Sequence, residues 1–458
     1  MRFARLILAA AMAAFMPVLV PAVAAADAGA GLLSHWVQMG PGGAAELRVA
    51  TTAAQCPDVA VDGHRTAMVV RAKAGDGFPL ICSAPLPGTA RSAWLVDPAA
   101  PPDAAGPAIR IAPVPLPAAA PKRILVLGDT GCRIKGGSVQ ACNDPAQWPF
   151  PLLARVAAAE KPDLIVHVGD YLYRESPCPP HDARCAGSPS GDNWASWDAD
   201  FFAPARPLLE VAPFIFVRGN HEDCPRAGAG WLRLMGPGPF VPGQCGHLAP
   251  YAVPLGAMNL VVMDSASAPD QLIDHNLLAT YRADFHKIAQ LAPAPVWLAS
   301  HRPLWGAVSR MGFRVGGNRT MIAALDPADL APVSLMLSGH IHAFEVLNYR
   351  KPLPPQLIAG NGGDKLDTAP ADLAGANLSG QAVKDGFSLP GFGFAMLTQD
   401  DHGWRIAVHR DDGSLARTCH LAKGHGTRPR IGRTRIGHTR IGHTRIGHTR
   451  IDCLQTAQ

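Results

Sequence analysis

Five short motifs could supply metal ligands or catalytic groups, and each follows an apolar run. In chain order they are Gly128-Asp129-Thr130-Gly131, Gly169-Asp170-Tyr171-Leu172-Tyr173, Gly219-Asn220-His221-Glu222, Ser300-His301 and Gly339-His340-Ile341-His342. In open α/β sheets, ligands bind just beyond the carboxyl ends of the strands. We therefore expect the polar side chains of these motifs to meet at one edge of the fold.

Each motif alone has an ordinary explanation. An Asp at a strand end is often a helix N-cap, and a His-x-His pair is often two residues on one face of a strand. Together, the imidazoles and carboxylates suit zinc, iron or manganese. Two such ions about 3.5–4 Å apart can clamp the attacking and leaving oxygens of a phosphoryl displacement. One carboxylate must bridge the two ions, and Asp170, on a central strand, is the natural candidate.

The elements that position these motifs alternate between strand and helix. Strands are predicted at 124–127, 164–168, 214–217, 260–263, 296–299 and 333–337, and helices at 152–160, 277–291 and 321–324. This alternation favours an α/β sheet covered on both faces. The late runs 394–397 and 404–409 are predicted to be antiparallel and to form part of a second sheet that closes the domain.

Over about residues 122–365, the motif series resembles the calcineurin-like metallophosphoesterases, and within them most closely the purple acid phosphatases. Most of that superfamily has Asp-x-His in the first motif, where this chain has Asp129-Thr130-Gly131. The purple enzymes also lack this His and have a Tyr in Gly-Asp-x-x-Tyr, which matches Tyr173 here. A phenolate is a hard, anionic donor and should favour trivalent iron.

The resemblance implies a four-layer αββα sandwich preceded by a small all-β domain of fibronectin or immunoglobulin type. It also implies a binuclear metal centre and a metal-bound hydroxide as the nucleophile. Fe(III) would be held by Asp129, Asp170, Tyr173 and His342, and the second ion, Fe(II), Zn(II) or Mn(II), by Asp170, Asn220, His301 and His340.

Several roles stay open at this point. His221 would orient the substrate or protonate the leaving oxygen, or would only make a supporting hydrogen bond. Plant-type relatives carry further His residues after the fourth motif, where this chain has Arg302 and Arg310, so substrate choice and pH optimum are open. The turn at 360–363 could form a backbone wall of the site or be an ordinary turn.

The expected activity is hydrolysis of phosphate monoesters on a small phosphorylated substrate. One alternative is a phosphodiesterase acting on cyclic nucleotides or phospholipids through the same site. Another is a non-enzymatic cell-surface or binding protein in which the metal centre is structural. The positive charge lies mainly in the two terminal segments and the rest of the chain is mildly acidic, so no nucleic-acid surface is expected.

Residues 1–26 have the pattern of an export signal, with Arg2 and Arg5 before an apolar stretch and Ala24-Ala25-Ala26 at its end. A permanent membrane anchor is the alternative, although the stretch is short and contains prolines. No later segment is apolar enough to span a bilayer. We expect a periplasmic or secreted protein without stable membrane insertion after the signal is removed.

The ten cysteines agree with export, because oxidising compartments permit disulfides. A cysteine-based metal site is the weaker alternative, since no Cys-x-x-Cys pair occurs. The expected pairs are sequence neighbours: Cys56–Cys82, Cys132–Cys142, Cys178–Cys185 and Cys224–Cys245, with Cys419 and Cys453 left over. Disulfides at Cys132 and Cys224 would fix loops of the site; inert buried thiols are the alternative.

Four further segments follow the signal. Residues 27–98 are predicted to be a small β-rich module of unknown partners, with strands at 46–50, 67–71 and 92–96, and residues 99–121 a Pro/Ala-rich linker with one strand at 108–111. Residues 122–423 form the catalytic domain. Residues 424–458 carry an Arg-Ile-Gly-His-Thr repeat, predicted to be disordered. Its His438, His443 and His448 could bind metal loosely and its arginines could meet an anionic surface, or the repeat could be inert.

Overall fold

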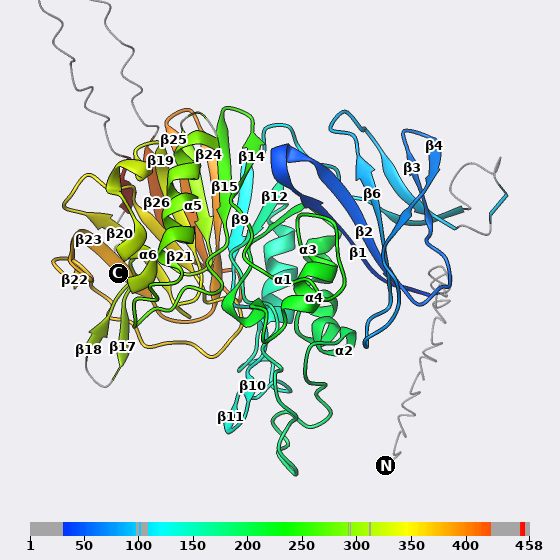
Figure 1. The fold of residues 1–458 in the computed structure, drawn as a ribbon, viewed down its shortest axis with the longest axis horizontal. Helices are drawn as coiled ribbons and strands as arrows, with labels where there is room; N and C mark the ends of the chain where they lie inside the picture. Colours follow the sequence, from blue (N-terminus) through cyan, green and yellow to red (C-terminus); the bar gives the residue numbers. More distant parts are fainter. Residues whose placement is uncertain are drawn as a thin grey trace, which may run out of the picture.

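The computed structural model describes residues 31–97, 100–101, 109–291, 293, 295–310, 313–422 and 449–453. The predicted signal, 1–26, and most of the predicted tail lie outside this range. The described part is built on two large sheets, of eleven and eight strands, with the strand-rich N-terminal region at one end (Figure 1). None of the described helices is long and apolar enough to cross a membrane.

The eleven-stranded sheet has three parallel strands at its centre, all of them short apolar runs buried on both faces. They are β9 (Arg123–Leu127), β12 (Leu164–His167) and β13 (Phe214–Phe216). Beyond β9 lie the antiparallel strands β24 (Gly393–Asp400), β25 (Gly403–Arg410), β26 (Leu415–Ala422) and β27 (Ile451–Cys453). Beyond β13 lie β1 (Leu32–Met39), β2 (Ala45–Thr51), β6 (Leu80–Leu86) and β5 (Val69–Ala72).

The eight-stranded sheet also has a parallel centre. Its strands, in spatial order, are β14 (Tyr251–Leu255), β15 (Met258–Met263), β16 (Val296–Ser300), β19 (Val333–Ser338), β21 (Gln356–Ala359), β20 (Phe344–Tyr349), β23 (Gln381–Leu389) and β22 (Asn377–Leu378). Strands β15, β16, β19 and β21 run parallel. The motif strands β16 and β19 are therefore central here, as β9, β12 and β13 are in the first sheet.

Three hydrophobic clusters define four layers. Alternate residues of the two sheets, such as Val126 and Leu337, face each other in an inner core. The outer face of the first sheet is covered by α1 (Phe150–Ala159) and α3 (Ala203–Leu209). The outer face of the second is covered by α5 (Leu278–Leu291) and α6 (Arg319–Ala324). This arrangement confirms the predicted αββα sandwich (Figure 1).

The remaining elements are short. They include α2 (Trp194–Trp197), a π-helical turn η3 (Asp198–Phe202), α4 (Gly228–Leu234), and the 3-10 turns η1 (Pro41–Gly43), η4 (Asn220–Glu222) and η5 (Pro327–Leu330). Two small hairpins are β10 (Ile134–Lys135) with β11 (Ser138–Val139) and β17 (Val308–Arg310) with β18 (Phe313–Val315).

The prediction for the late antiparallel strands was right about their direction and wrong about their sheet. Strand β24 pairs with β9 in the first sheet, not with the second. Its residues are buried on both faces, because Ala395 and Leu397 point into the inner core while Phe394 and Met396 point toward α1. An apolar strand of this kind is suited to a position inside the sheet and not at a closing edge.

The N-terminal region is strand-rich, as predicted, but it is hydrogen-bonded to the catalytic sheet. Strand β1 pairs in parallel with β13 through Gln38 and Phe214. A further sheet of β4 (His64–Ala67), β3 (Asp58–Val61), β7 (Ala93–Val96) and β8 (Arg110–Pro113) completes the region. The predicted linker thus contributes β8, close to the expected strand at 108–111.

Two arginines of this N-terminal region contact the end of α4, the helix that follows the third motif. Arg48 donates to the carbonyl oxygens of Leu234 at 2.6 Å and Gly236 at 2.8 Å, and Arg71 to that of Leu232 at 2.9 Å. Carbonyls at a helix C-terminus lack partners inside the helix. The arginines satisfy them, so the β region holds α4 in place.

All ten cysteines are paired. The four predicted pairs form, and the two remaining cysteines join as Cys419–Cys453. The last pair links β26 to β27, where Ile451 is also buried. The prediction of disorder through the whole tail was therefore wrong for Ile451–Cys453, because a disulfide and a buried side chain anchor them.

One ion pair should make stability depend on pH. His247 Nε2 lies 2.6 Å from Asp284 Oδ2 on α5 and its Nδ1 lies 4.0 Å from Asp264 Oδ2. Burial lowers the pKa of His247, but these carboxylates outweigh it and hold the pKa above the usual 6.5. The pair therefore stabilises the fold fully below the unfolded-state pKa, and this contribution disappears as pH rises through the raised folded-state value.

We expect His247→Gln to reduce the free energy of unfolding by about 1 kcal/mol at most, because the pair is partly exposed. The reduction should be larger at pH 5.5 than at pH 9, as measured by urea unfolding at both values. Replacement of the exposed His402 by Gln serves as the control. Equal losses at both pH values would show that the ion pair is not responsible.

Candidate metal centre

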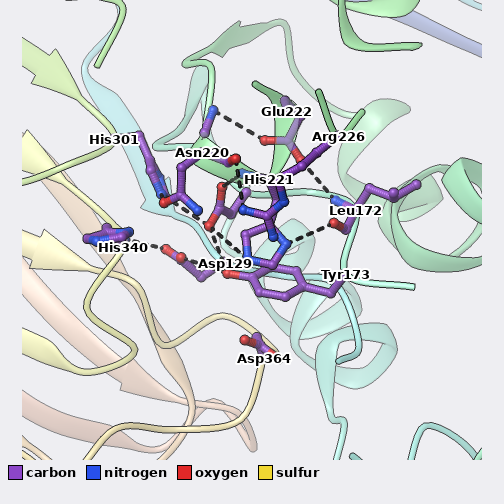
Figure 2. Close-up of polar contacts among 12 residues, drawn as sticks. Asp129, Leu172, Tyr173, Asn220, His221, Glu222, Arg226, His301, His340 and Asp364 are labelled. Atoms are coloured by element: carbon purple, nitrogen blue, oxygen red, sulfur yellow. Dashed lines mark hydrogen bonds and ion pairs between the residues drawn. The ribbon is translucent and has the colours of Figure 1, made fainter. Parts of the chain in front are cut away.

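The five motifs meet at the carboxyl ends of the parallel strands of both sheets. Asp129 follows β9, Asp170 and Tyr173 follow β12, and Asn220 follows β13. His301 follows β16, and His340 and His342 follow β19. Figure 2 shows five of these side chains approaching one another from separate loops, those of Asp129, Tyr173, Asn220, His301 and His340. The structure thus brings all seven predicted ligand side chains together, although which of them bind metal stays a prediction.

The first group of donors surrounds the phenol of Tyr173. Its hydroxyl oxygen lies 3.0 Å from Asp129 Oδ1, 3.0 Å from Asp170 Oδ2 and 3.0 Å from His342 Nε2. Burial and the two carboxylates raise the pKa of this phenol well above 10. A single O–H proton cannot serve three partners at once, so this geometry suits a shared cation at the centre.

The second group lies on the other side of Asp170. His301 Nε2 is 3.1 Å from Asp170 Oδ2 and 3.1 Å from Asn220 Oδ1. Ligand atoms of Asp170, His301 and His340 lie within 4.8 Å of one another, as do those of Asp129, Asp170 and His342. Asp170 is common to both groups, which is the position expected of a bridging carboxylate.

The hydrogen bonds of the three histidines fix which ring nitrogen faces the centre. His301 Nδ1 is 2.8 Å from the carbonyl oxygen of Val168, and His342 Nδ1 is 2.9 Å from that of Lys365. Both Nδ1 atoms must donate, so in the neutral ring, the form that binds a metal, each Nε2 carries a lone pair. His340 is reversed, because its Nε2 is 2.8 Å from Asp270 Oδ2. Such outer hydrogen bonds are typical of histidines that bind metal, and the donor set fits the binuclear centre.

Three of these residues have a left-handed backbone. The φ angles of Asp129, Asp170 and His340 are 57°, 57° and 69°. Non-glycine residues in this region carry strain and persist only where the surrounding structure enforces it. Here the enforcement includes a hydrogen bond from His340 N to Asp129 Oδ2, at 2.9 Å.

The structure explains why Gly131 stands where most of the superfamily has His. A Cβ atom on Gly131 would lie 2.4 Å from the carbonyl oxygen of Tyr171 and 2.9 Å from Cδ2 of Tyr173. A side chain at this position is incompatible with the place that Tyr173 occupies. The missing His and the added Tyr are therefore linked by packing.

The turn at 360–363 packs against the backbone of the first motif. Gly362 N donates to the Gly128 carbonyl at 3.0 Å, and Asp364 N donates to the Asp129 carbonyl at 2.8 Å. A Cβ on Gly362 would lie 2.5 Å from the Gly128 oxygen. The backbones touch directly, so the turn supports the loop that carries Asp129, and none of its four residues lines the cavity beside the centre. The disulfide Cys132–Cys142 begins one residue after the first motif and restrains the same loop.

His221 lies beside the first group of donors and lines a cavity of 390 Å³. Its ring is tilted by 38° against that of Tyr173 with centroids 3.8 Å apart, and its backbone N donates to Asp170 Oδ1 at 2.8 Å. Its Nδ1 lies 2.7 Å from Glu175 Oε1 and 3.2 Å from the Leu172 carbonyl. Burial lowers the pKa of His221 despite these neighbouring carboxylates.

Sequence reasoning missed several acids around the centre. Glu175 contacts His221, and Asp270 contacts His340. Asp364 Oδ2 lies 3.1 Å from His342 Nδ1. Glu175 lies only two residues beyond Tyr173, and Asp364 directly follows the glycine-rich turn. Both are therefore close in sequence to a segment already assigned to the site, and this proximity could have identified them. Asp270 had none.

Arg302, which replaces the additional His of the plant-type pattern, does not stand free in the site. It forms a short ion pair with Asp270, and its Nη1 is 3.1 Å from His340 Nε2. Asp270 is therefore shared between His340 and Arg302. Together with Asn318 Nδ2, 2.8 Å away, they hold the pKa of Asp270 far below its usual range although burial raises it. The side chain of Arg310 lies outside the described residues.

Asp200, a further acid that the sequence did not indicate, lies on the π-helical turn η3 and ties two motif loops together. Its Oδ2 accepts from the backbone N of Tyr173 at 2.7 Å and of Arg174 at 3.0 Å. Its Oδ1 accepts from the backbone N of Cys132 at 3.1 Å and from Arg174 Nε at 2.6 Å. The carboxylate is fully buried. It therefore fixes the loops that carry Asp129 and Tyr173 relative to each other.

Comparison with known proteins agrees with this geometry. Residues 122–344 match the family model of the calcineurin-like phosphoesterases. The fold is similar to that of a purple acid phosphatase from yellow lupin (Lupinus luteus) seeds, with a TM-score of 0.53 at 15% identity over 85% of this chain and 74% of that one. A structure of PhoD matches with a TM-score of 0.45 at 12% identity over 85% and 89%.

No curated protein sequence matches the chain significantly. The assignment therefore rests on the domain match and on the fold, which carries the five motifs at the expected edge of the sheets. On these grounds, residues 122–344 form a calcineurin-like phosphoesterase domain, and the protein is a hydrolase.

Proposed function

We propose that the protein is an exported, binuclear metal-dependent phosphatase that hydrolyses phosphate monoesters. The observation that carries the proposal is the pair of donor groups that share Asp170 beneath the 390 Å³ cavity. A cavity of this size suits a small phosphorylated molecule.

The Fe(III) position would be held by Asp129, Asp170, Tyr173 and His342. The phenol of Tyr173 favours a hard trivalent ion, and its equal distances to three other donors support this assignment. The second position, for Fe(II), Zn(II) or Mn(II), would be held by Asp170, Asn220, His301 and His340. When bound, such a pair neutralises phosphate charge and lowers the pKa of a coordinated water.

His221 is placed to handle the proton of the leaving group. Its Nδ1 lies between two acceptors, Glu175 and the Leu172 carbonyl, so Nδ1 must donate. When the ring is doubly protonated, Nε2 is then the atom that can give a proton to the leaving oxygen in the cavity. Glu175 is fixed in turn by Arg226 and, at 3.2 Å, by Lys135 Nζ. His221 and Arg226 hold the pKa of Glu175 at about 2 although burial raises it, so Glu175 carries a negative charge that favours the protonated form of His221.

Export is part of the proposal. It is supported by the signal-like sequence at 1–26 and by the five disulfides, which form and persist in oxidising compartments. Detection of the processed protein in a periplasmic or culture-medium fraction would test it. Retention of the unprocessed chain in the cytoplasm would contradict it.

The enzymatic part is tested on the full chain. We expect bound iron, a visible absorption band from the phenolate, and faster hydrolysis of an aryl phosphate monoester than of the matching bis-aryl diester. A colourless, iron-free protein that is fully active with zinc would remove the iron assignment and leave the phosphatase. Preference for the diester would make the protein a phosphodiesterase, and a metal-loaded protein inactive on both would favour a structural centre.

A further inference from the structure

The rim of the cavity carries two cations with different surroundings, and this difference bears on substrate choice. Arg133 and Lys365 line the same cavity as Asp170, His221 and His342. If the proposed phosphatase function places the ester phosphate at the metal centre, both cations face the part of the substrate that leaves.

Arg133 is already neutralised. Its guanidinium forms a close ion pair with Asp364, whose side chain is fully buried, and Nε lies 3.1 Å from Oδ2 of that carboxylate. Its carbon Cζ also lies 5.3 Å from the centroid of the Tyr173 ring. Arg133 therefore holds Asp364 in place. Because its charge is neutralised by this carboxylate, it attracts an anionic ligand only weakly.

Lys365 is different. Its backbone is fixed, because its N donates to Gln140 Oε1 at 3.1 Å and its carbonyl accepts from His342 Nδ1 at 2.9 Å. The residue thus sits directly against a predicted ligand of the Fe(III) position. Its side chain is exposed, and none of the ion pairs among the described residues involves its ammonium group.

Among the described residues, the acids that line the cavity form their hydrogen bonds and ion pairs with groups other than the Lys365 side chain. Asp270 pairs with Arg302 and His340, and Asp170 lies between the two donor groups. Asp367, two residues from Lys365, accepts from the backbone N of His342 at 3.1 Å. The Lys365 ammonium is therefore an exposed positive charge that lacks an ion-pair partner among the described residues, on a side chain that lines the cavity.

We propose, on the basis of the proposed phosphatase function, that Lys365 determines specificity by binding a second anionic group on the leaving part of the substrate. The preferred substrate class is then a small phosphate monoester whose leaving group carries a carboxylate or a further phosphate. The ester phosphate occupies the metal centre, and the second anion meets Lys365 at the rim. An uncharged leaving group leaves Lys365 solvated.

The test uses three aryl esters: 4-carboxyphenyl phosphate, its uncharged methyl ester, and 1,4-phenylene bisphosphate. We compare kcat/KM of the wild type with that of Lys365→Gln and Lys365→Arg. We expect Lys365→Gln to lose about 10-fold more on the charged esters than on the methyl ester, and Lys365→Arg to keep most of the preference. Comparing the carboxylate with the bisphosphate identifies which second anion is favoured.

Three further measurements sharpen the result. The preference should shrink as salt rises, because exposed charges are screened. Lys287→Gln, on α5 and away from the cavity, removes the same charge and should not alter the preference. Binding of 4-carboxybenzylphosphonate relative to benzylphosphonate, measured by calorimetry, should fall about 10-fold in Lys365→Gln without any turnover.

The outcomes are distinguishable. Equal losses on charged and uncharged esters, or a preference that survives in Lys365→Gln, would overturn the role of Lys365 and leave the phosphatase intact. If the metal-loaded wild type hydrolyses none of the three esters, the proposed function fails and the specificity inference fails with it.

Discussion

Replacement of His221 by Ala is expected to lower kcat on an aryl phosphate by about 10²–10⁴-fold, the usual contribution of a general acid or base. Metal content should not change. The hydrogen bond from His221 to Asp170 is made by its backbone N, at 2.8 Å, and the substitution keeps it; the side-chain Nε2 lies farther away, 3.8 Å from Asp170 Oδ2. Steady-state kinetics and elemental analysis of the same sample provide the measurement.

Two variants make this result specific. Glu175→Gln keeps an acceptor beside Nδ1 but removes the negative charge that supports a protonated imidazole, so we expect a smaller loss of about 10-fold. His286→Ala, with a side chain 70% exposed on α5, should have no effect. If His221→Ala loses metal together with activity, His221 supports the centre and does not transfer a proton. Wild-type turnover in that variant would also contradict the proposal.

Replacement of Asp200 by Ala should have the largest effect on stability. It leaves Arg174, whose side chain is 5% exposed, as a buried charge without its partner. Breaking a buried ion pair in this way costs about 3–5 kcal/mol. It also frees the backbone N of Cys132 and of Tyr173, so the loops that carry Asp129 and Tyr173 should loosen and metal affinity fall about 10–100-fold.

Urea unfolding and a metal competition titration measure the two effects separately. Asp200→Asn keeps the shape and part of the hydrogen bonding and should lose less of both. Asp198→Ala, in the same π-helical turn but away from these loops, is the matched control. Unchanged metal affinity in Asp200→Ala would show that the two loops hold their positions without this carboxylate.

The strands and motifs could be predicted because their signals are local. Each buried parallel strand is a short apolar run, and each motif lies within a few residues of the strand that positions it. The contacts that complete the site are not local. Asp270 meets His340 across 70 residues, and Arg133 meets Asp364 across 231. No sequence pattern connects such pairs, so the outer acids could not be assigned from the sequence.

The same limit applies to the N-terminal region. Its strands were predictable, yet its attachment depends on Arg48 and Arg71 binding backbone carbonyls at the end of α4. Every residue has a backbone carbonyl, so the sequence does not indicate which carbonyl an arginine will bind. Similarly, β24 could not be assigned to the correct sheet, since an apolar run does not reveal which of two cores its faces will meet.

The disulfide between Cys419 and Cys453 affects how freely the number of repeat units can vary. The pentapeptide repeat lies between these two cysteines, which face each other on neighbouring strands. The distance between the strands is set by the bond, whatever the length of chain that separates the cysteines. If the repeat is disordered, as the sequence predicts, doubling its length costs only about 0.6 kcal/mol in loop-closure entropy. Replication slippage could therefore add or delete repeat units with little selection against it from folding.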